Sequence, residues 1–238
     1  MIVVVGAAAL RTTPAGAGEA VGVAPEIAAA AAANGAAVEI VTKVGEDGAG
    51  EELLLALARS GVGHLAVLRD PIRPTALAME DAEPPDDDGD LVPALLAEAE
   101  ATAGRPPAHS PSRSSPAPSP AGILEPDDLA LGLRYLRDYR VVVAVEPLPD
   151  GGAAVIAEAA SFADAALVVV AQPGVAAPPA YAAATIIEAP ADDPDGAFAG
   201  LLGRYAAALD RGIAPTEAFR AATSEGGWEA TGGEAAGG

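Results

Sequence analysis

The chain has 238 residues, enough for one domain of ordinary size, and 34 acidic residues against 13 basic ones give it a formal net charge of −21. Such a surface repels phosphate backbones and anionic headgroups, which excludes polyanion-binding modules and argues against nucleic-acid or membrane partners. Without cysteine, the chain has neither a disulfide framework nor a cysteine nucleophile. No apolar run reaches the ~18 residues that a membrane span needs, and we expect a soluble cytoplasmic protein.

Strands and helices alternate in the first third of the chain. Short β-branched runs predict strands at 2–5, 38–42 and 65–68. Helices are expected between them, at 25–34 and 50–60, with a proline near the first turn of the former and Leu-rich spacing in the latter. This alternation is typical of parallel strands joined by crossover helices.

The composition changes between residues 79 and 122. Residues 79–100 carry nine acids and no base, and residues 105–120 carry six prolines among Ser and Ala. Such a segment buries too little apolar area to offset its ordering entropy, so we expect an exposed, mostly disordered insertion with a short helix at 91–103. It is either a solvated spacer or a docking segment regulated by modification at Ser112, Ser114 and Ser115 beside Arg113.

The alternation then resumes. We predict helices at 127–139 and 153–163, each followed by a strand, at 141–145 and 167–171. An extended piece follows at 183–188, and two closing helices are expected at 196–210 and 215–223. Tyr135 and Tyr139, four residues apart, are expected to pack one face of the first of these helices. The sequence therefore predicts one domain with halves at 1–78 and 123–226, divided by the insertion and followed by a flexible Gly-rich tail at 227–238.

Several motifs keep the spacing of a known family. After the strand within residues 35–50 come Lys43, Gly45, Asp47 and Gly50, in the pattern basic-x-Gly-x-Asp-x-x-Gly that precedes a Leu-rich helix. Pro74-Thr75-Ala76 is similar to the Pro-Thr-Gly that leads into a lid strand, and residues 195–226 are similar to a closing helix pair. Over 1–78 and 140–226 the chain resembles the PfkB (ribokinase-like) carbohydrate and nucleoside kinases.

The resemblance implies a three-layer α/β/α sandwich with a mostly parallel sheet. The chain is shorter than most family members, so we expect a reduced fold that lacks one strand-helix unit near the nucleotide side. Residues 162–171 could correspond to either of two consecutive family strands. Relatives often pair two subunits through lid strands, which implies a homodimer or a separate protein partner here. Glu146-Pro147 stands where the family often has Asp-Pro after a strand.

The substrate-pocket motifs depart from the family pattern. The position of the Asp that grips sugar hydroxyls is Arg11, and the Gly-Gly-x-x-x-Asn signature places its second Gly at Gly22 and its Asn at Glu26. With Lys43, Gly45 and Asp47, these residues make up the expected substrate-pocket positions. His64, expected in a strand, and His109 have no metal-ligand partner at useful spacing, so no metal site is expected from them.

The phosphoryl-transfer motif departs as well. The family's Gly-Ala-Gly-Asp holds phosphoryl oxygens on helix N-terminal amides and supplies the catalytic base; the matching residues are Asp193, Pro194, Asp195 and Gly196. Carboxylates there repel phosphate, and a proline removes one donor. The same residues are also good helix starters, and carboxylates can bind a divalent cation.

These departures lead to two functional hypotheses. The first is a kinase-like protein that has lost phosphoryl transfer and acts as a binding, regulatory or assembly subunit without a cofactor. The alternative is an active sugar or nucleoside kinase that uses ATP and Mg²⁺ and has Asp195, displaced by one residue, as its base.

Overall fold

Six parallel strands form the central sheet. The computed structural model describes residues 1–13, 16–78, 123–191, 193 and 195–225, so the expected insertion and tail lie outside the described residues. The strand order is β5-β4-β1-β6-β7-β8, and every neighbouring pair is parallel. The strands are β1 Ile2–Val5, β4 Val38–Gly45, β5 Val67–Asp70, β6 Val141–Val145, β7 Ala166–Ala171 and β8 Thr185–Glu188.

The sheet is buried on both faces. In β1, Ile2 and Val4 belong to the core on one face, Val3 and Val5 belong to the core on the other, and all four are fully buried. A strand that is covered on both faces has a continuous apolar sequence, because the side chains on neither face contact water. The β-branched runs of the sequence are therefore central strands, as expected.

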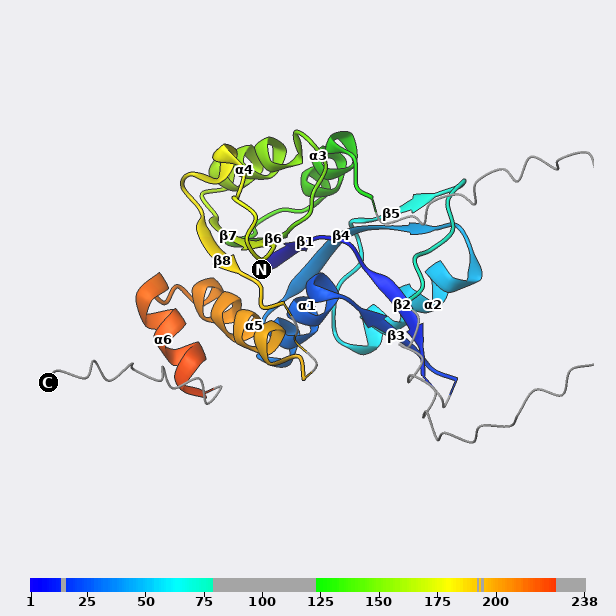
Figure 1. Ribbon diagram of the computed structural model, residues 1–238, viewed down its shortest axis with the longest axis horizontal. Helices are drawn as coiled ribbons and strands as arrows, with labels where there is room; N and C mark the ends of the chain where they lie inside the picture. The colour runs from blue at the N-terminus through cyan, green and yellow to red at the C-terminus, as the bar shows by residue number, and fades with distance from the viewer. Residues whose placement is uncertain (14–15, 79–122, 192, 194, 226–238) are drawn as a thin grey trace, which may run out of the picture.

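Helices cover both faces of the sheet (Figure 1). Helices α1, α2, α5 and α6 contribute to one core, and α3 and α4 contribute to the other. The predicted three-layer α/β/α sandwich is thereby confirmed. The helices are α1 Val23–Ala33, α2 Gly48–Arg59, α3 Pro126–Tyr135, α4 Gly152–Phe162, α5 Ala197–Asp210 and α6 Pro215–Glu225, with a short 3-10 helix, η1, at Pro179–Tyr181.

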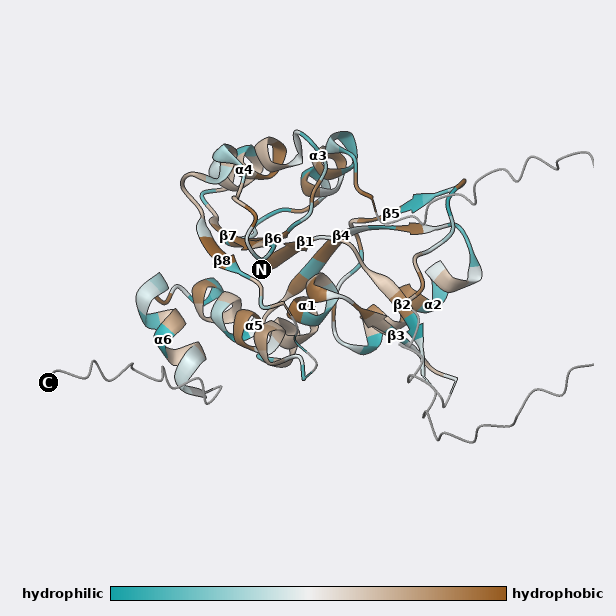
Figure 2. Cartoon of the chain, in the orientation of Figure 1, coloured by the Kyte–Doolittle hydropathy of each residue, from teal (hydrophilic) through white to brown (hydrophobic). Residues whose placement is uncertain are grey.

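Small residues let α1 and α5 pack closely. A Cβ atom added at Gly203 of α5 would lie 2.4 Å from the Ala30 Cβ and 2.7 Å from the Ala31 amide nitrogen of α1. Real Cβ atoms do not approach so closely, so only glycine fits between these helices. Close approach of the two helix backbones thus gives a dense core from small side chains. The most hydrophobic segments of the chain lie in and beside the sheet (Figure 2).

A two-stranded antiparallel hairpin projects beyond the sheet. It consists of β2, Ala9–Thr12, and β3, Gly18–Val21, neither of which the sequence analysis anticipated. Leu10 of β2 donates its amide to the Ala76 carbonyl at 2.9 Å and accepts from the Ala78 amide at 2.9 Å. The lid stub that begins at Pro74 therefore lies along β2.

Three local predictions were wrong. Helix α3 ends at Tyr135 rather than at 139, because the chain turns through a left-handed residue, Asp138 (φ 59°), before it enters β6. Tyr139 consequently leaves the helix and donates its hydroxyl to the Ala159 carbonyl of α4 at 3.2 Å, whereas Tyr135 is 70% exposed. Strand β5 begins two residues later than expected, so His64 precedes it in a turn region.

The strand order reverses at the centre of the sheet. From β1 the chain proceeds outward through β4 to β5, and from the neighbouring strand β6 it proceeds outward through β7 to β8. Crevices at the carboxyl ends of strands flanking such a reversal are where open α/β sheets bind ligands. No helix in the described part of the chain is both long and apolar enough to cross a membrane.

Candidate functional site

A carboxylate of the chain itself covers the first turn of α5. Both side-chain oxygens of Asp193 accept a hydrogen bond from the Phe198 amide at 3.1 Å, and Oδ2 also accepts from the Ala199 amide at 3.2 Å. The N-cap residue is Gly196, whose left-handed conformation (φ 63°) turns the chain into the helix. First-turn amides carry a partial positive charge that attracts anions, and here Asp193 is the anion.

Asp193 and Gly196 line a hollow of about 690 Å³ together with Arg11 and Glu26. The walls come from the β2-β3 hairpin, α1, the end of α2 and the beginning of α5. The structure thus places two expected substrate-pocket positions, Arg11 and Glu26, beside two positions of the phosphoryl-transfer motif, Asp193 and Gly196. Their common location supports treating this hollow as the candidate functional site.

Charged side chains in the walls of the hollow already have hydrogen-bond partners within the chain. Arg11 contacts Glu19 across the hairpin, with Nη2 2.9 Å from Oε2. Glu26 accepts the Gly22 amide on Oε1 at 3.1 Å, one turn back along α1. Arg59, also in the wall, donates to Glu52 at 3.0 Å. The arrangement therefore does not concentrate positive charge where a phosphate group would need it.

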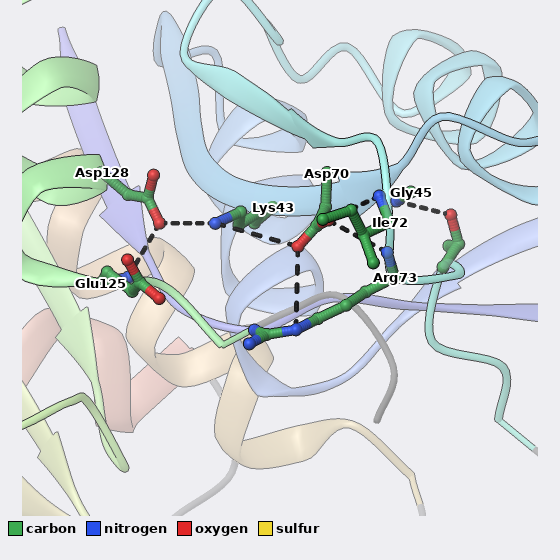
Figure 3. Close-up of polar contacts among 8 residues, drawn as sticks. Lys43, Gly45, Asp70, Ile72, Arg73, Glu125 and Asp128 are labelled. Atoms are coloured by element: carbon green, nitrogen blue, oxygen red, sulfur yellow. Dashed lines mark hydrogen bonds and ion pairs between the residues drawn. The ribbon is translucent and has the colours of Figure 1, made fainter. Parts of the chain in front are cut away.

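Lys43 lies instead in a separate charged cluster at the carboxyl ends of β4 and β5 (Figure 3). Its Nζ is 2.8 Å from Oδ2 of Asp128 and 4.0 Å from Oδ2 of Asp70. The same Asp128 oxygen accepts the Glu125 amide at 2.9 Å, which forms part of a capping box at the beginning of α3. Lys43 therefore ties two strands to a helix from the second half of the chain.

Asp70 in this cluster also organises its own turn. Its Oδ1 accepts the Ile72 amide at 2.9 Å and the Arg73 amide at 3.0 Å. These two amides, with a smaller contribution from the Lys43 charge, lower the pKa of the Asp70 carboxyl. The carboxylate form is thus favoured by the fold itself.

Gly45 and Asp47 form a third group around Thr75. Asp47 is the N-cap of α2 and accepts the Gly50 amide at 2.8 Å, the Thr75 hydroxyl at 2.7 Å and the Thr75 amide at 2.9 Å. The bonds from Thr75 and Gly50 lower the pKa of the Asp47 carboxyl, although burial opposes the shift. The Thr75 hydroxyl in turn accepts the Gly45 amide at 2.9 Å.

Gly45 has no room for a side chain. A Cβ atom there would lie 2.6 Å from the Thr75 nitrogen and 2.7 Å from the Arg73 carbonyl oxygen. The basic-x-Gly-x-Asp-x-x-Gly pattern thus builds a joint that holds the segment after β5 against the turn before α2. Its Lys43, Gly45 and Asp47 are absent from the lining of the hollow that holds Arg11 and Glu26.

The remaining predicted site residues lie near the beginning of α5. Asp195 is exposed and directly precedes the cap residue Gly196, and Pro194 lies outside the described residues. In the part of the chain that the structure describes, no three His, Cys, Asp or Glu side chains cluster closely enough to hold a metal ion.

Sequence reasoning missed the partners of these residues. Thr75 had been noted only as part of a lid motif, and Asp70 and Asp128 had not been singled out. Asp128 had a local signal, because an acid three residues after Glu125 and just past a proline is typical of a capped helix start. The contact between Lys43 and Asp128 spans 85 positions and has no such signal.

Solved structures show which fold this is. Over 94% of this chain and 89% of the other, a carbohydrate kinase from Agrobacterium tumefaciens superposes with a TM-score of 0.58 at 16% identity. A PfkB protein from Polaromonas sp. JS666 gives 0.56 at 15% identity, over 94% of each chain. A ribokinase from Arabidopsis thaliana, complexed with ribose and ATP, gives 0.55 at 14% identity, over 94% of this chain and 90% of the other.

The chain therefore has the ribokinase-like fold of the PfkB sugar kinases, as the sequence motifs predicted. No family model matches the sequence, and no curated protein matches it either. At identities this low the likeness establishes the fold, and the chemistry of the site has to be argued from this chain's own residues.

Proposed function

We propose that this protein is a kinase-like scaffold that has lost phosphoryl transfer and serves as a binding, regulatory or assembly subunit. The observation that carries the proposal is the Asp193 carboxylate on the Phe198 and Ala199 amides of α5. A transferred phosphoryl group needs uncommitted donors at such a helix terminus. Here those donors are committed to an anion that belongs to the chain.

The catalytic base of the resembled motif is also missing from this chain. The position that supplies the catalytic carboxylate in the resembled motif is Gly196, which has no side chain. Loss of a general base typically lowers a rate by ~10²–10⁴-fold, and loss of an oxyanion donor lowers it by a further ~10²–10³-fold. Together these losses lower the rate of phosphoryl transfer by ~10⁴–10⁷-fold.

ATP and Mg²⁺ do not fit this end of α5. Asp193 occupies the amides, and its charge repels a γ-phosphate that Mg²⁺ neutralises only in part. We accordingly propose a protein that works in the cytoplasm without a nucleotide or metal cofactor. Its net charge of −21 continues to disfavour nucleic acid and membrane surfaces as partners.

The lid stub beside β2 is a candidate surface for assembly with another chain. Leu77 of the lid stub is 64% exposed and lies beside Leu10 of β2, and an exposed apolar edge of this kind favours pairing with another chain. We propose a homodimer or a complex with a protein partner through this lid. Light scattering at tens of micromolar should give a particle larger than the 23.2 kDa chain; a monodisperse monomer would argue against homodimerisation.

The decisive assay is ADP release from Mg·ATP in the presence of a panel of sugars and nucleosides. We expect no substrate-dependent release above a heat-killed control. Release that depends on substrate and is abolished by Asp195→Ala would overturn the proposal. It would establish the alternative, an active ATP-dependent kinase in which Asp195, exposed beside the cap of α5, is the base.

A further inference from the structure

A second pocket lies at the carboxyl edge of the sheet and shares Val21 with the hollow at α5. It has a volume of about 490 Å³, within the range of small-molecule sites. Its walls include the chain after β1, the end of β3 and the segment after β6. Because β1 and β6 flank the reversal of strand order, the pocket sits where the topology of an open α/β sheet places a ligand.

The lining of this pocket is apolar throughout. Every lining residue is a glycine, an alanine, a proline or a larger aliphatic residue: Ala7, Ala8, Ala9, Val21, Gly22, Ala76, Ile123, Leu124, Pro147, Leu148 and Pro149. A sugar buried against such walls would leave its hydroxyl groups without hydrogen-bond partners from side chains, at a cost of ~1–3 kcal/mol for each unsatisfied group. The walls instead suit a ligand without polar groups.

One acidic side chain beside this pocket, Glu146, hydrogen-bonds its own turn. Glu146 directly precedes the lining residue Pro147, but its Oε2 accepts the Leu148 amide at 2.7 Å. Its Oε1 is buried, as is the hydroxyl of Tyr181. Burial, together with the neighbouring Glu146 charge and a side-chain hydrogen bond to Glu146, raises the pKa of Tyr181. Glu146 therefore serves its own turn rather than the pocket.

We propose that this pocket binds a neutral, apolar small molecule about the size of a bicyclic aromatic compound. The apolar walls set the polarity of the ligand, and the volume sets its size. The net charge of −21 disfavours an anionic ligand. This inference does not depend on the loss of phosphoryl transfer, because no lining residue belongs to the beginning of α5.

The test uses the full chain and N-phenyl-1-naphthylamine, a neutral probe whose fluorescence rises when it leaves water. We expect saturable one-to-one binding with a dissociation constant on the order of 10 µM. Ile123→Asp introduces a charge into the wall at a residue that is 56% exposed, so the fold tolerates it, and binding should weaken about tenfold or more. Ala76→Leu, which fills space without adding charge, should also weaken binding.

The matched control is Ile72→Asp. Ile72 is 82% exposed and does not line the pocket, so this variant should bind like the wild-type chain. The proposal is overturned by any of three results. These are the absence of saturable binding, equal binding by the Ile123→Asp and Ile72→Asp variants, and displacement of the probe by millimolar D-ribose, which would assign the pocket to a sugar. None of these readouts depends on ADP release.

Discussion

Replacing Lys43 by methionine removes the cation that joins β4 to α3. The Lys43 side chain is 13% exposed and that of Asp128 is 19% exposed, so their 2.8 Å contact is largely shielded from water. A hydrogen bond to a charged group in such a place contributes ~1.5–3 kcal/mol, and its removal leaves the Asp128 carboxylate without its counter-ion. We expect Lys43→Met to lower the free energy of unfolding by about 2 kcal/mol, which in a chain of this size lowers Tm by about 4–8 °C.

A double-mutant cycle isolates the pair. Thermal unfolding of Lys43→Met, Asp128→Asn and the double variant should give a coupling energy of at least about 1 kcal/mol. The control cycle uses Arg11→Met and Glu19→Gln, whose side chains are 46% and 50% exposed; it should give about 0.5 kcal/mol or less. Equal coupling in both cycles would refute the view that Lys43 is a buried joint between the two halves of the chain.

Three further predictions concern the neighbouring groups. Gly45→Ala should lower the unfolding free energy by about 2 kcal/mol in urea titrations, because the alanine Cβ would meet the Thr75 nitrogen and the Arg73 carbonyl oxygen. The control is Gly48→Ala, whose Cβ would have open space around it, and it should raise the unfolding free energy by up to about 0.5 kcal/mol. The fold lowers the pKa of Asp47 below its usual 3.8, so its contribution to stability is present above that value and disappears as the pH falls through the lowered pKa. Asp47→Asn should therefore lose less stability than the wild-type chain between about pH 5 and pH 2 in chemical denaturation, and parallel pH profiles would contradict this reasoning. Asp193→Ala should lower the unfolding free energy by about 1 kcal/mol through loss of the cap on α5, whereas Asp193→Asn should retain most of it; identical Tm values for the two variants would contradict the capping role.

The strands of the central sheet and their parallel direction could be predicted because they depend on local patterns. A run such as Ile2–Val5 is apolar on both faces only if both faces are covered, and helices between such runs imply crossovers. The end of α3 could not be predicted from periodicity alone. The turn at Asp138 releases Tyr139 from the helix, and Tyr139 instead packs against α4, a contact with a distant segment.

The residues of the candidate site could be selected from sequence motifs, but which of them lie together in the fold could not be predicted. The sequence analysis expected Arg11 and Glu26 in a substrate pocket and Asp193 in a separate phosphoryl-transfer motif, and the fold brings all three to one hollow. It also assigned Lys43 to the substrate pocket by spacing, whereas the structure surrounds this lysine with Asp70 and Asp128. Long-range charge pairs leave no trace in local spacing, so this part of the site is recognisable only in the folded chain.

The most direct test of the account is the Tm of the wild-type chain as Mg·ATP is titrated into the millimolar range. A nucleotide bound at one hundred times its dissociation constant adds about 2.7 kcal/mol to the stability of the fold, equivalent to a rise of about 5–10 °C in a chain of this size. Because Asp193 holds the amides of Phe198 and Ala199, the account predicts no change in Tm. A saturable rise of about 5 °C or more would contradict it.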